Sequence, residues 1–299
     1  MIAYLTHDRI AKDRWDDCIA QAVNGQVYAW SWYLDIVHPG WEALVEIKDD
    51  KYQSVMPITS KRKYLIPYLC QPFFAQQLGV FSRKPIDVHT TEAFLHAIPN
   101  RFRWVEIRLN EQNPIPVGRK GVDYHQNHLL DLSKDYNTLL SDYHKNTQRN
   151  LKKSLNDRLV ISAVDDLAPV IQLFRDDRGA SIAHWGDAEY SRLHRLSQVA
   201  CSLSKAFIYI VEHSEYKQII CGALFLKTDS RITFLFSGNS ALGKSCHAMT
   251  FLIDKVIAEF AGQSLLLDFE GSDDPNLARY YQGFGARPIS YPSYTRHCF

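Results

Sequence analysis

Residues 232–270 read ITFLFSGNSALGKSCHAMTFLIDKVIAEFAGQSLLLDFE, and the prediction of the fold depends on how this stretch is interpreted. Its segment Ser237–Ser245 contains GxxxxGKS, the spelling of the loop with which P-loop enzymes cradle nucleotide phosphates. A helix-like segment then leads to an apolar run that ends in Asp268 and Glu270, where such enzymes carry a magnesium-binding aspartate. The flanking segments determine whether nucleotide hydrolysis is tenable.

The flanking segments exclude a P-loop sheet. A P-loop directly follows a parallel central strand and needs several further strand–helix units after it. Here Ile219–Lys227 and Ile232–Phe236 are separated by a four-residue turn, which predicts an antiparallel pair. The chain has 299 residues, so 55 follow Lys244, enough for about one more strand–helix unit. We therefore reject a nucleotide-hydrolysing site. Gly238, Gly243 and the start of the next helix can still present backbone N–H groups to an anion.

Length and composition indicate the number of domains, the class of protein and the kinds of partner to expect. A chain of 299 residues exceeds the usual size of one domain, so two domains are expected. Hydrophobic residues make up 46% and charged residues 22%, which is typical of a soluble globular protein. The net charge of +1 creates no global field for nucleic acid or an anionic membrane, so partners must be argued from local features.

Cysteine usage and the N-terminal segment indicate the compartment. The six cysteines form no CxxC pair and mostly lie within apolar stretches, which is typical of reduced core residues rather than metal ligands or disulfides. The first residues, MIAYLTHDRIAKDRW, carry charges every few positions, and no apolar run reaches the roughly 18 residues needed for a membrane span. We expect a cytoplasmic protein without a bound metal.

The order of predicted elements recurs in the two halves of the chain. Each half shows helices, then antiparallel strands, then one helix and one further strand, which indicates a topological duplication. In the first half Lys48-Asp-Asp-Lys51 is turn chemistry that predicts a hairpin, and in the second half one polar helix is expected from Tyr136 to Leu155. The segment Asn110–Asn127 is rich in Pro, Gly and charge and reads as the linker. The fold class is therefore α/β with mixed (α+β) sheets, in two domains over 1–125 and 126–299. In each domain a mostly antiparallel meander precedes a helix and a parallel strand.

Several segments resemble the FemA/FemX-like branch of the GNAT acyltransferases, in which two GNAT modules lie in one chain. The likeness is strongest from about residue 128 onward and looser before it. The segments that carry it are LDFEGS (267–272), ARYYQGFGA (278–286), DLSKDY (131–136), YHKNTQRNLKK (143–153), AWSWYLD (29–35) and QPFFAQQLG (71–79).

The resemblance implies transfer of an acyl or aminoacyl group to an amine. Characterised members of the family extend peptidoglycan side chains from aminoacyl-tRNA, so the substrate is expected to be a cell-wall precursor or similar small molecule. Acyl-CoA is the expected donor and aminoacyl-tRNA the alternative. The chain departs from the usual GNAT phosphate loop, Arg/Gln-x-x-Gly-x-Gly/Ala, because only Gly243 lies near the expected place. The long helical hairpin thought to grip tRNA has no evident counterpart. The candidate donor-binding residues are Gly238, Asn239, Gly243, Lys244 and Ser245.

Two carboxylates are candidates for the catalytic base. Aminolysis needs a neutral amine and a proton for the leaving group. Asp268 and Glu270 alternate with apolar residues on a predicted strand, so one face would carry both carboxylates, and either could accept the ammonium proton. In the alternative interpretation, Glu270 only holds the Gly271–Ser272 turn.

Tyr281 is the candidate acid. It lies four residues before Gly285, and the resemblance implies that this Tyr-x-x-x-Gly spacing places the phenol that protonates the leaving thiolate. A phenol with a pKa near 10 suits that task. Its neighbour Tyr280 could be the core-facing partner or could exchange roles with it.

Two further segments supply candidate substrate-binding residues. Arg149 and Lys152 belong to a basic helix surface, which either is solvated or docks a phosphate. Arg178, His184 and Trp185 lie in a mixed polar and apolar segment between helices, as substrate-lining loops do, although a structural role is the favoured interpretation for the histidine.

A catalytically silent module is the competing function. In that interpretation the degenerate phosphate loop reflects lost donor binding, and the cleft merely holds a ligand. The pattern gives no indication of the oligomeric state.

Overall fold

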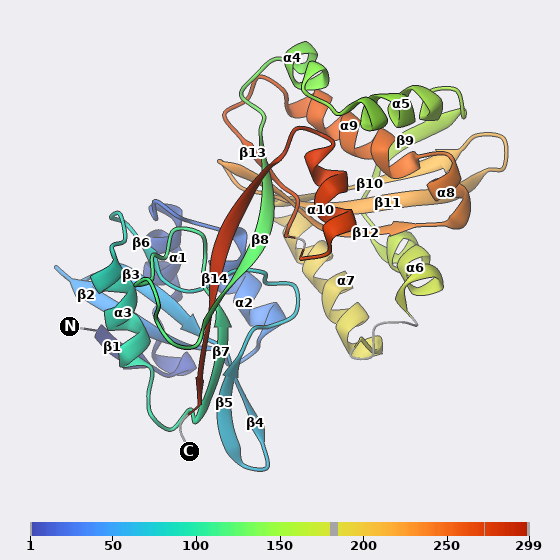
Figure 1. Ribbon diagram of the computed structural model, residues 1–299. Helices are drawn as coiled ribbons and strands as arrows, with labels where there is room; N and C mark the ends of the chain where they lie inside the picture. Colours follow the sequence, from blue (N-terminus) through green and yellow to red (C-terminus); the bar gives the residue numbers. More distant parts are fainter. Residues whose placement is uncertain (1, 180–184, 272, 298–299) are drawn as a thin grey trace. The chain divides into compact units, whose positions relative to one another are not determined.

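The computed structural model describes residues 2–179, 185–271 and 273–297, and the chain divides into two compact units (Figure 1). The first comprises Met1–Gln126 and Ile289–Phe299, and the second Asn127–Pro288. The closing segment, expected in the second domain, is therefore part of the first unit. Its strand β14 (Arg287–His297) pairs antiparallel with β7 (Trp104–Arg108) of that unit. That each unit is an independent domain stays a prediction.

The first unit contains two groups of paired strands with helices around them. One sheet has the order β1-β2-β3-β6, and β4, β5, β7 and β14 follow one another in a second strand order. Its elements are β1 (Ile2–Leu5), α1 (Lys12–Ala20), α2 (Ser31–Val37), β2 (Glu42–Lys48), β3 (Lys51–Ile58), β4 (Ser60–Lys63), β5 (Ile66–Cys70), β6 (Phe81–Ser82), α3 (Val88–Ala97) and β7, with short 3₁₀ turns at His7–Arg9 and Val27–Ala29.

The β2–β3 hairpin of the first unit forms where turn chemistry predicted it. Asp49 and Asp50 have φ of 50° and 58°, the left-handed conformation that a two-residue hairpin turn requires. After α3 the chain enters β7, which runs parallel to β5. The predicted order of antiparallel strands, helix and parallel strand is confirmed for this unit.

The second unit is built on the strand order β8-β13-β12-β11-β10-β9. Its elements are β8 (Val122–Asp131, which begins in the first unit), α4 (Tyr136–Ser141), α5 (Lys145–Ser154), β9 (Leu159–Val164), α6 (Ala168–Asp177), α7 (Asp187–Ser202), β10 (Ala206–His213), β11 (Gln218–Lys227), β12 (Arg231–Asn239), α8 (Ala241–Ser245), α9 (Ala248–Phe260), β13 (Leu266–Asp268) and α10 (Pro275–Gln282).

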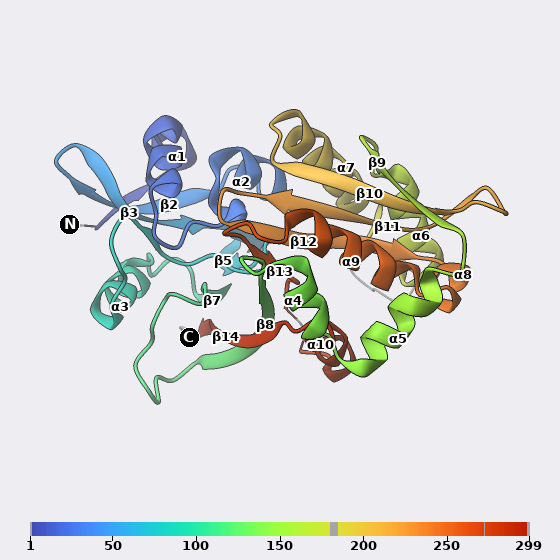
Figure 2. The same cartoon turned by 90° about the horizontal axis from the view of Figure 1, so that it is seen from above.

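The sheet of the second unit is covered on both faces. Helices α6 and α7 lie against one face, and α9 with α5 lies over the other (Figure 2). Strand β11 accordingly reads as a continuous apolar run, IICGALFL, rather than an alternation, because both of its faces are buried. This central strand and α9 together supply much of the core of the unit.

Strand β12 has different neighbours along its length, and this positions the site. It pairs antiparallel with β11 from Lys227↔Ile232 to Cys221↔Asn239, as predicted. On its other edge it pairs parallel with β13, but only from Arg231↔Leu266 to Thr233↔Asp268. The part of β12 from Phe234 to Asn239 therefore continues beyond the end of β13, which stops at Asp268.

Two local expectations are wrong. The single helix expected from Tyr136 to Leu155 is two helices, α4 and α5. The break forms because Tyr143 bonds its hydroxyl to the buried Asp254 of α9, and the N–H of His144 bonds the Gly283 carbonyl. Strand β8 begins at Val122, inside the segment interpreted as a linker.

Candidate functional site

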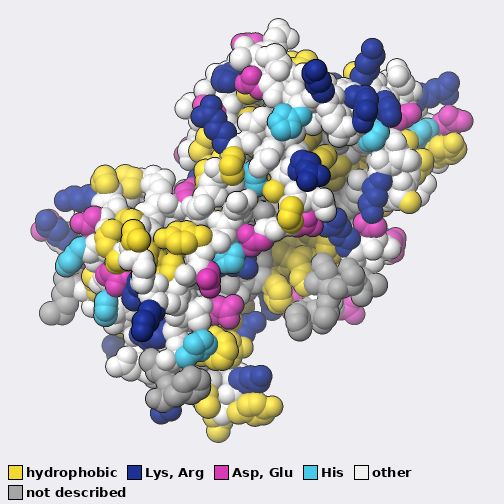
Figure 3. Space-filling model, in the orientation of Figure 1, with side chains coloured by type: hydrophobic (Ala, Val, Ile, Leu, Met, Phe, Trp, Pro, Cys, Tyr) yellow, Lys and Arg dark blue, Asp and Glu magenta, His cyan; other side chains and the backbone are white. Residues whose placement is uncertain are grey.

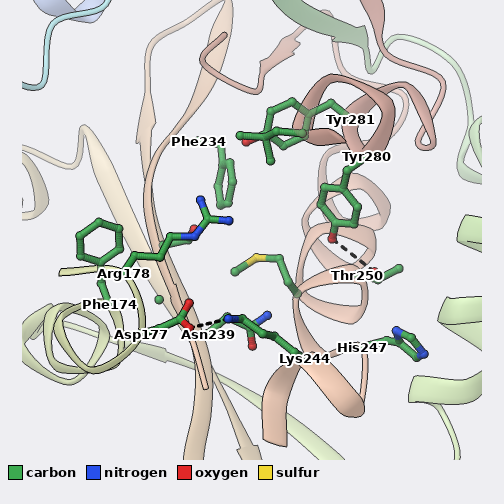
Figure 4. A pocket seen from close by; sticks show the side chains of 14 residues that line it. Phe174, Asp177, Arg178, Phe234, Asn239, Lys244, His247, Thr250, Tyr280 and Tyr281 are labelled. Atoms are coloured by element: carbon green, nitrogen blue, oxygen red, sulfur yellow. Dashed lines mark hydrogen bonds and ion pairs between the residues drawn. The ribbon is translucent and has the colours of Figure 1, made fainter. Parts of the chain in front are cut away.

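A pocket of about 310 Å³ lies in the second unit beside the part of β12 that continues past the end of β13 (Figure 4). β12 forms one wall, and α9 and α10 form the opposite one. The C-terminal end of α6 and the α8 segment complete the lining. Figure 4 shows Tyr281 at one end of this space and Lys244 with His247 at the other.

Gly238 allows α6 to lie directly against β12. A Cβ atom at this position would stand 2.4 Å from the carbonyl oxygen of Val170 and 2.8 Å from the Cβ of Leu173. Only a residue without a side chain permits this approach. The approach brings the end of α6, with Asp177 and the adjoining Arg178, into the pocket. Gly238 thus shapes the pocket through helix packing.

The GKS letters form a short helix rather than a phosphate loop. Ser240 caps α8 by accepting a hydrogen bond from the N–H of Gly243 at 3.0 Å, so that N–H is already used. Lys244 extends its ammonium to Asp177 at 2.5 Å. The hydroxyl of Ser245 donates to the Leu242 carbonyl and is not part of the pocket lining. Of the five candidate donor-binding residues, Gly238, Asn239 and Lys244 line the pocket.

The helix start that was expected, with Gly238 and Gly243, to attract an anion is the N-terminus of α9. His247 is the N-cap, with φ of 54°, and its side chain makes no capping hydrogen bond to the first turn. The first N–H groups of a helix have no partner within the helix, and its dipole is positive at this end. His247, Met249 and Thr250 line the pocket, so this end of α9 meets it.

Tyr281 lies where α10 meets the pocket. The side chain is 5% exposed, and its ring stacks on Phe269 with centroids 4.7 Å apart. Burial raises the pKa of the phenol, and the neighbouring Tyr280 and Glu270 raise it further, whereas Arg178 lowers it. The phenol is therefore protonated at neutral pH. Figure 4 shows Arg178 extending into the same space from the end of α6.

Tyr280 is distinguished from Tyr281 by its hydroxyl partner. Its oxygen lies 3.2 Å from Oγ1 of Thr250 on α9 (Figure 4). Burial raises the pKa of Tyr280 as well. The two neighbouring tyrosines thus both contribute to the pocket, and Tyr280 also joins α10 to α9.

Asp268 lies in a buried polar network. It is 1% exposed and accepts hydrogen bonds from Arg231 at 2.8 Å and from the Asn127 amide at 2.9 Å. It also accepts the backbone N–H of Glu270 at 2.8 Å. Asp268 is not part of the pocket lining, and its contacts tie β13 to β12 and β8.

Asp268 and Glu270 do not share one face of a strand, so that expectation is wrong. β13 ends at Asp268, and Glu270 has φ of 52°, outside strand geometry. The turn is held by Asp268 and by Asn127, whose Oδ1 accepts the Gly271 N–H at 2.6 Å. Glu270 is half-buried and acts on the Tyr281 phenol electrostatically.

The predicted substrate-binding residues fall in different places. Arg178 lines the pocket, and Trp185 packs beside it against Phe174, with ring centroids 5.3 Å apart. Arg149 and Lys152 lie on α5 and do not line the pocket; the guanidinium of Arg149 bonds the Asn146 side chain. His184 lies outside the described residues.

His128 is a buried residue beside the site that sequence reasoning did not single out. It has no exposed surface, its Nε2 lies 3.3 Å from the Gln282 amide, and its Nδ1 has no hydrogen-bond partner. Burial lowers its pKa. Its ring lies 6.1 Å from that of Tyr281. Its position between β8 and α10 follows from tertiary pairing, which a lone histidine in an apolar strand does not reveal.

The described residues contain neither a metal-ligand cluster nor a membrane-spanning helix. Across 2–179, 185–271 and 273–297, no group of three or more His, Cys, Asp or Glu side chains is arranged to hold a metal ion. Over the same ranges, no helix is both long and apolar enough to cross a bilayer.

Comparison with solved structures identifies the fold. A crystal structure of FemX has a TM-score of 0.67 at 11% identity, covering 97% of this chain and 96% of that one. A tandem GNAT protein from the clavulanic acid biosynthesis pathway has a TM-score of 0.56 at 11% identity, covering 99% and 98%. A protein of unknown function from Bacteroides thetaiotaomicron has a TM-score of 0.58 at 8% identity, covering 99% and 100%. No family model and no curated protein matches the sequence.

Proposed function

From this FemX-like tandem GNAT fold, we propose that the second unit binds an activated acyl or aminoacyl donor in the β12 pocket and transfers the group to an amine. One observation carries the proposal. Beyond Thr233, β12 continues past the end of β13 and lines a pocket with the α9 N-terminus at one end and the Tyr281 phenol at the other.

Acyl-CoA fits the two ends of this pocket by its chemistry. Its diphosphate is an anion of the kind that helix N-termini attract, and Lys244 and His247 lie at the same end of the pocket as the α9 N-terminus. Its extended arm carries amide groups that can pair with an exposed strand edge. Aminoacyl-tRNA, the alternative donor, offers the same combination of phosphate and activated carbonyl.

Tyr281 is the proposed general acid. Attack of a neutral amine on the thioester or ester carbonyl forms the new C–N bond and breaks the C–S or C–O bond. The leaving sulfur or oxygen takes up a proton, and the amine nitrogen loses one. The Tyr281 phenol, which burial keeps protonated at neutral pH, is the proposed donor of the proton that the leaving sulfur or oxygen takes up. Glu270, coupled electrostatically to Tyr281, is the proposed acceptor of the amine proton.

The proposed acceptor is an amine of a cell-envelope precursor or a similar small molecule. This part rests on the resemblance of the second-unit segments to the FemA/FemX family. Arg178 and Trp185 are the proposed acceptor contacts, because one lines the pocket and the other packs beside it.

A binding module without catalysis is the second candidate. Among the described residues that line the pocket, the carboxylate is Asp177, and it is held in an ion pair by Lys244. A site whose lining carboxylate is neutralised lacks a base in direct contact with the amine. This candidate predicts donor binding without turnover.

One assay separates the two functions. The purified chain is incubated with acetyl-CoA, longer acyl-CoAs or aminoacyl-tRNA, together with a panel of amines that includes UDP-linked peptidoglycan precursors. Amine-dependent release of free thiol or uncharged tRNA, with the acylated amine detected by mass spectrometry, supports the transferase. Donor binding without amine-dependent release supports the silent module, and stabilisation by ATP with magnesium alone contradicts both.

A further inference from the structure

The β4–β5 hairpin of the first unit ends in an unusually exposed apolar tip. Tyr64 and Leu65 are each 88% exposed and Ile66 is 52% exposed. Figure 1 shows this hairpin extending beyond the other strands of its unit, and Figure 3 shows hydrophobic side chains at its end next to Lys and Arg. A folded chain gains nothing from such a tip in water, since its apolar surface stays hydrated.

The backbone conformation at the tip is unfavourable for large side chains. Tyr64 and Leu65 have φ of 50° and 66°, the left-handed conformation of both central residues in a two-residue hairpin turn. Asn and Gly adopt this conformation with little strain, whereas large side chains do so at a cost. Two large apolar residues therefore occupy the positions that are least favourable for them by conformation and by solvation.

Positive charge lies immediately behind the apolar tip. Lys61, Arg62 and Lys63 are consecutive and exposed on β4, and the segment from Ser60 to Cys70 contains no acidic residue. The strand register places Lys61 opposite Tyr68 and Lys63 opposite Ile66. Two of the three cations thus share a hairpin face with apolar side chains.

The apolar surface continues from the tip along this face. Tyr68 on β5 pairs in register with Trp104 on β7, which is 48% exposed. A groove of about 400 Å³ runs between them. Glu106, the carboxylate among the described residues that line it, lies opposite Cys70, at the end away from the tip.

We propose that this hairpin docks on an anionic lipid bilayer, with the side chains of Tyr64 and Leu65 entering the headgroup region. An apolar tip with aromatic residues suits the boundary between headgroups and acyl chains. The three cations behind it lie at the height of the lipid phosphates, where each strengthens binding to an anionic surface about fivefold. The whole chain has a net charge of only +1, so this local cluster supplies the attraction. The inference does not rest on the proposed activity.

Vesicle sedimentation of the full chain tests the docking surface. The vesicles are phosphatidylcholine alone or with about one-third phosphatidylglycerol. The wild type is expected to bind the anionic vesicles, to bind neutral ones at least tenfold more weakly, and to lose affinity as salt rises. The double change Tyr64→Ser, Leu65→Ser and the triple change Lys61→Gln, Arg62→Gln, Lys63→Gln are each expected to weaken binding more than tenfold.

Val117→Ser is the matched control, because Val117 is fully exposed and belongs to the same unit but not to the hairpin segment from Ser60 to Cys70. It is expected to bind as the wild type does. A Leu65→Trp reporter is expected to shift its fluorescence to the blue on anionic vesicles. Wild-type binding by the tip variant overturns the proposal, as does failure of the wild type to bind anionic vesicles. Self-association in ultracentrifugation that the tip variant abolishes assigns the surface to a second copy of the chain and also overturns it.

Discussion

Burial decides the chemistry available to Asp268 and Tyr281. Asp268 is enclosed by Arg231, Asn127 and the Glu270 N–H, whose hydrogen bonds use both of its oxygens. Tyr281 is almost equally buried, but its ring borders the pocket and burial raises the pKa of its hydroxyl. A buried aspartate with these partners supports the fold, whereas a buried phenol beside a cavity can donate a proton.

Tyr281→Phe tests the acid role. We expect turnover to fall by about 100-fold, a typical contribution of a positioned general acid, with little change in the midpoint of thermal unfolding. Tyr280→Phe is the matched control, since it removes the adjacent hydroxyl that bonds Thr250. Equal losses in both variants, or wild-type turnover in Tyr281→Phe, would remove the assigned role.

His128 predicts a pH dependence of stability. Burial lowers its pKa in the folded state below the ordinary value near 6.5. As pH falls, the unfolded chain therefore binds a proton at His128 before the folded chain does. The contribution of neutral, buried His128 to the free energy of unfolding is present above about pH 6.5 and is lost below it, by at most about 1.4 kcal/mol per pH unit. Urea unfolding of the wild type and His128→Gln should give free energies of unfolding whose difference changes below that pH. A constant difference between wild type and His128→Gln would contradict the assignment.

At the scale of elements, sequence reasoning was strongest where local chemistry decides. The antiparallel β11–β12 pair, α9 and the parallel strand β13 follow from a short turn, an apolar helix and the length left in the chain. Patterning could not locate the break between α4 and α5, because Tyr143 and His144 find their partners on α9 and after α10.

The candidate site, too, was predictable only where local sequence pattern determines it. Tyr281 and Lys244 were expected in the pocket and line it, whereas the strand-like alternation at Glu270 is interrupted by a distant residue, Asn127. His128 and Asp177 reach the site or its edge through tertiary packing that no local pattern encodes.

Gly238→Ala tests the contact between α6 and β12. The added Cβ meets backbone atoms of α6, so we expect a loss of about 1–3 kcal/mol in the free energy of unfolding, measured with urea. Gly186→Ala is the control, because its Cβ would meet only the Glu189 carboxylate at 3.5 Å. Similar small losses in the two variants would show that α6 does not depend on this close approach.

At the scale of the whole molecule, two units of related organisation are placed in one chain. Each has antiparallel strands followed by a helix and a parallel strand, and the fold as a whole matches that of FemX over almost its full length. The described pocket with the uncapped helix start and the buried phenol belongs to the second unit, and the exposed basic hairpin belongs to the first. We infer that the second unit carries out the proposed group transfer and that the first contributes the proposed membrane-docking hairpin.

Hydrogen exchange of the full chain with and without donor tests the central claim most directly. With saturating acyl-CoA or aminoacyl-tRNA, we expect slower exchange at Phe234–Asn239 of β12 and in the first turn of α9, because the donor covers that strand edge and helix end. A donor that leaves both segments unchanged and protects amides elsewhere, or protection of these segments by ATP with magnesium alone, would contradict it.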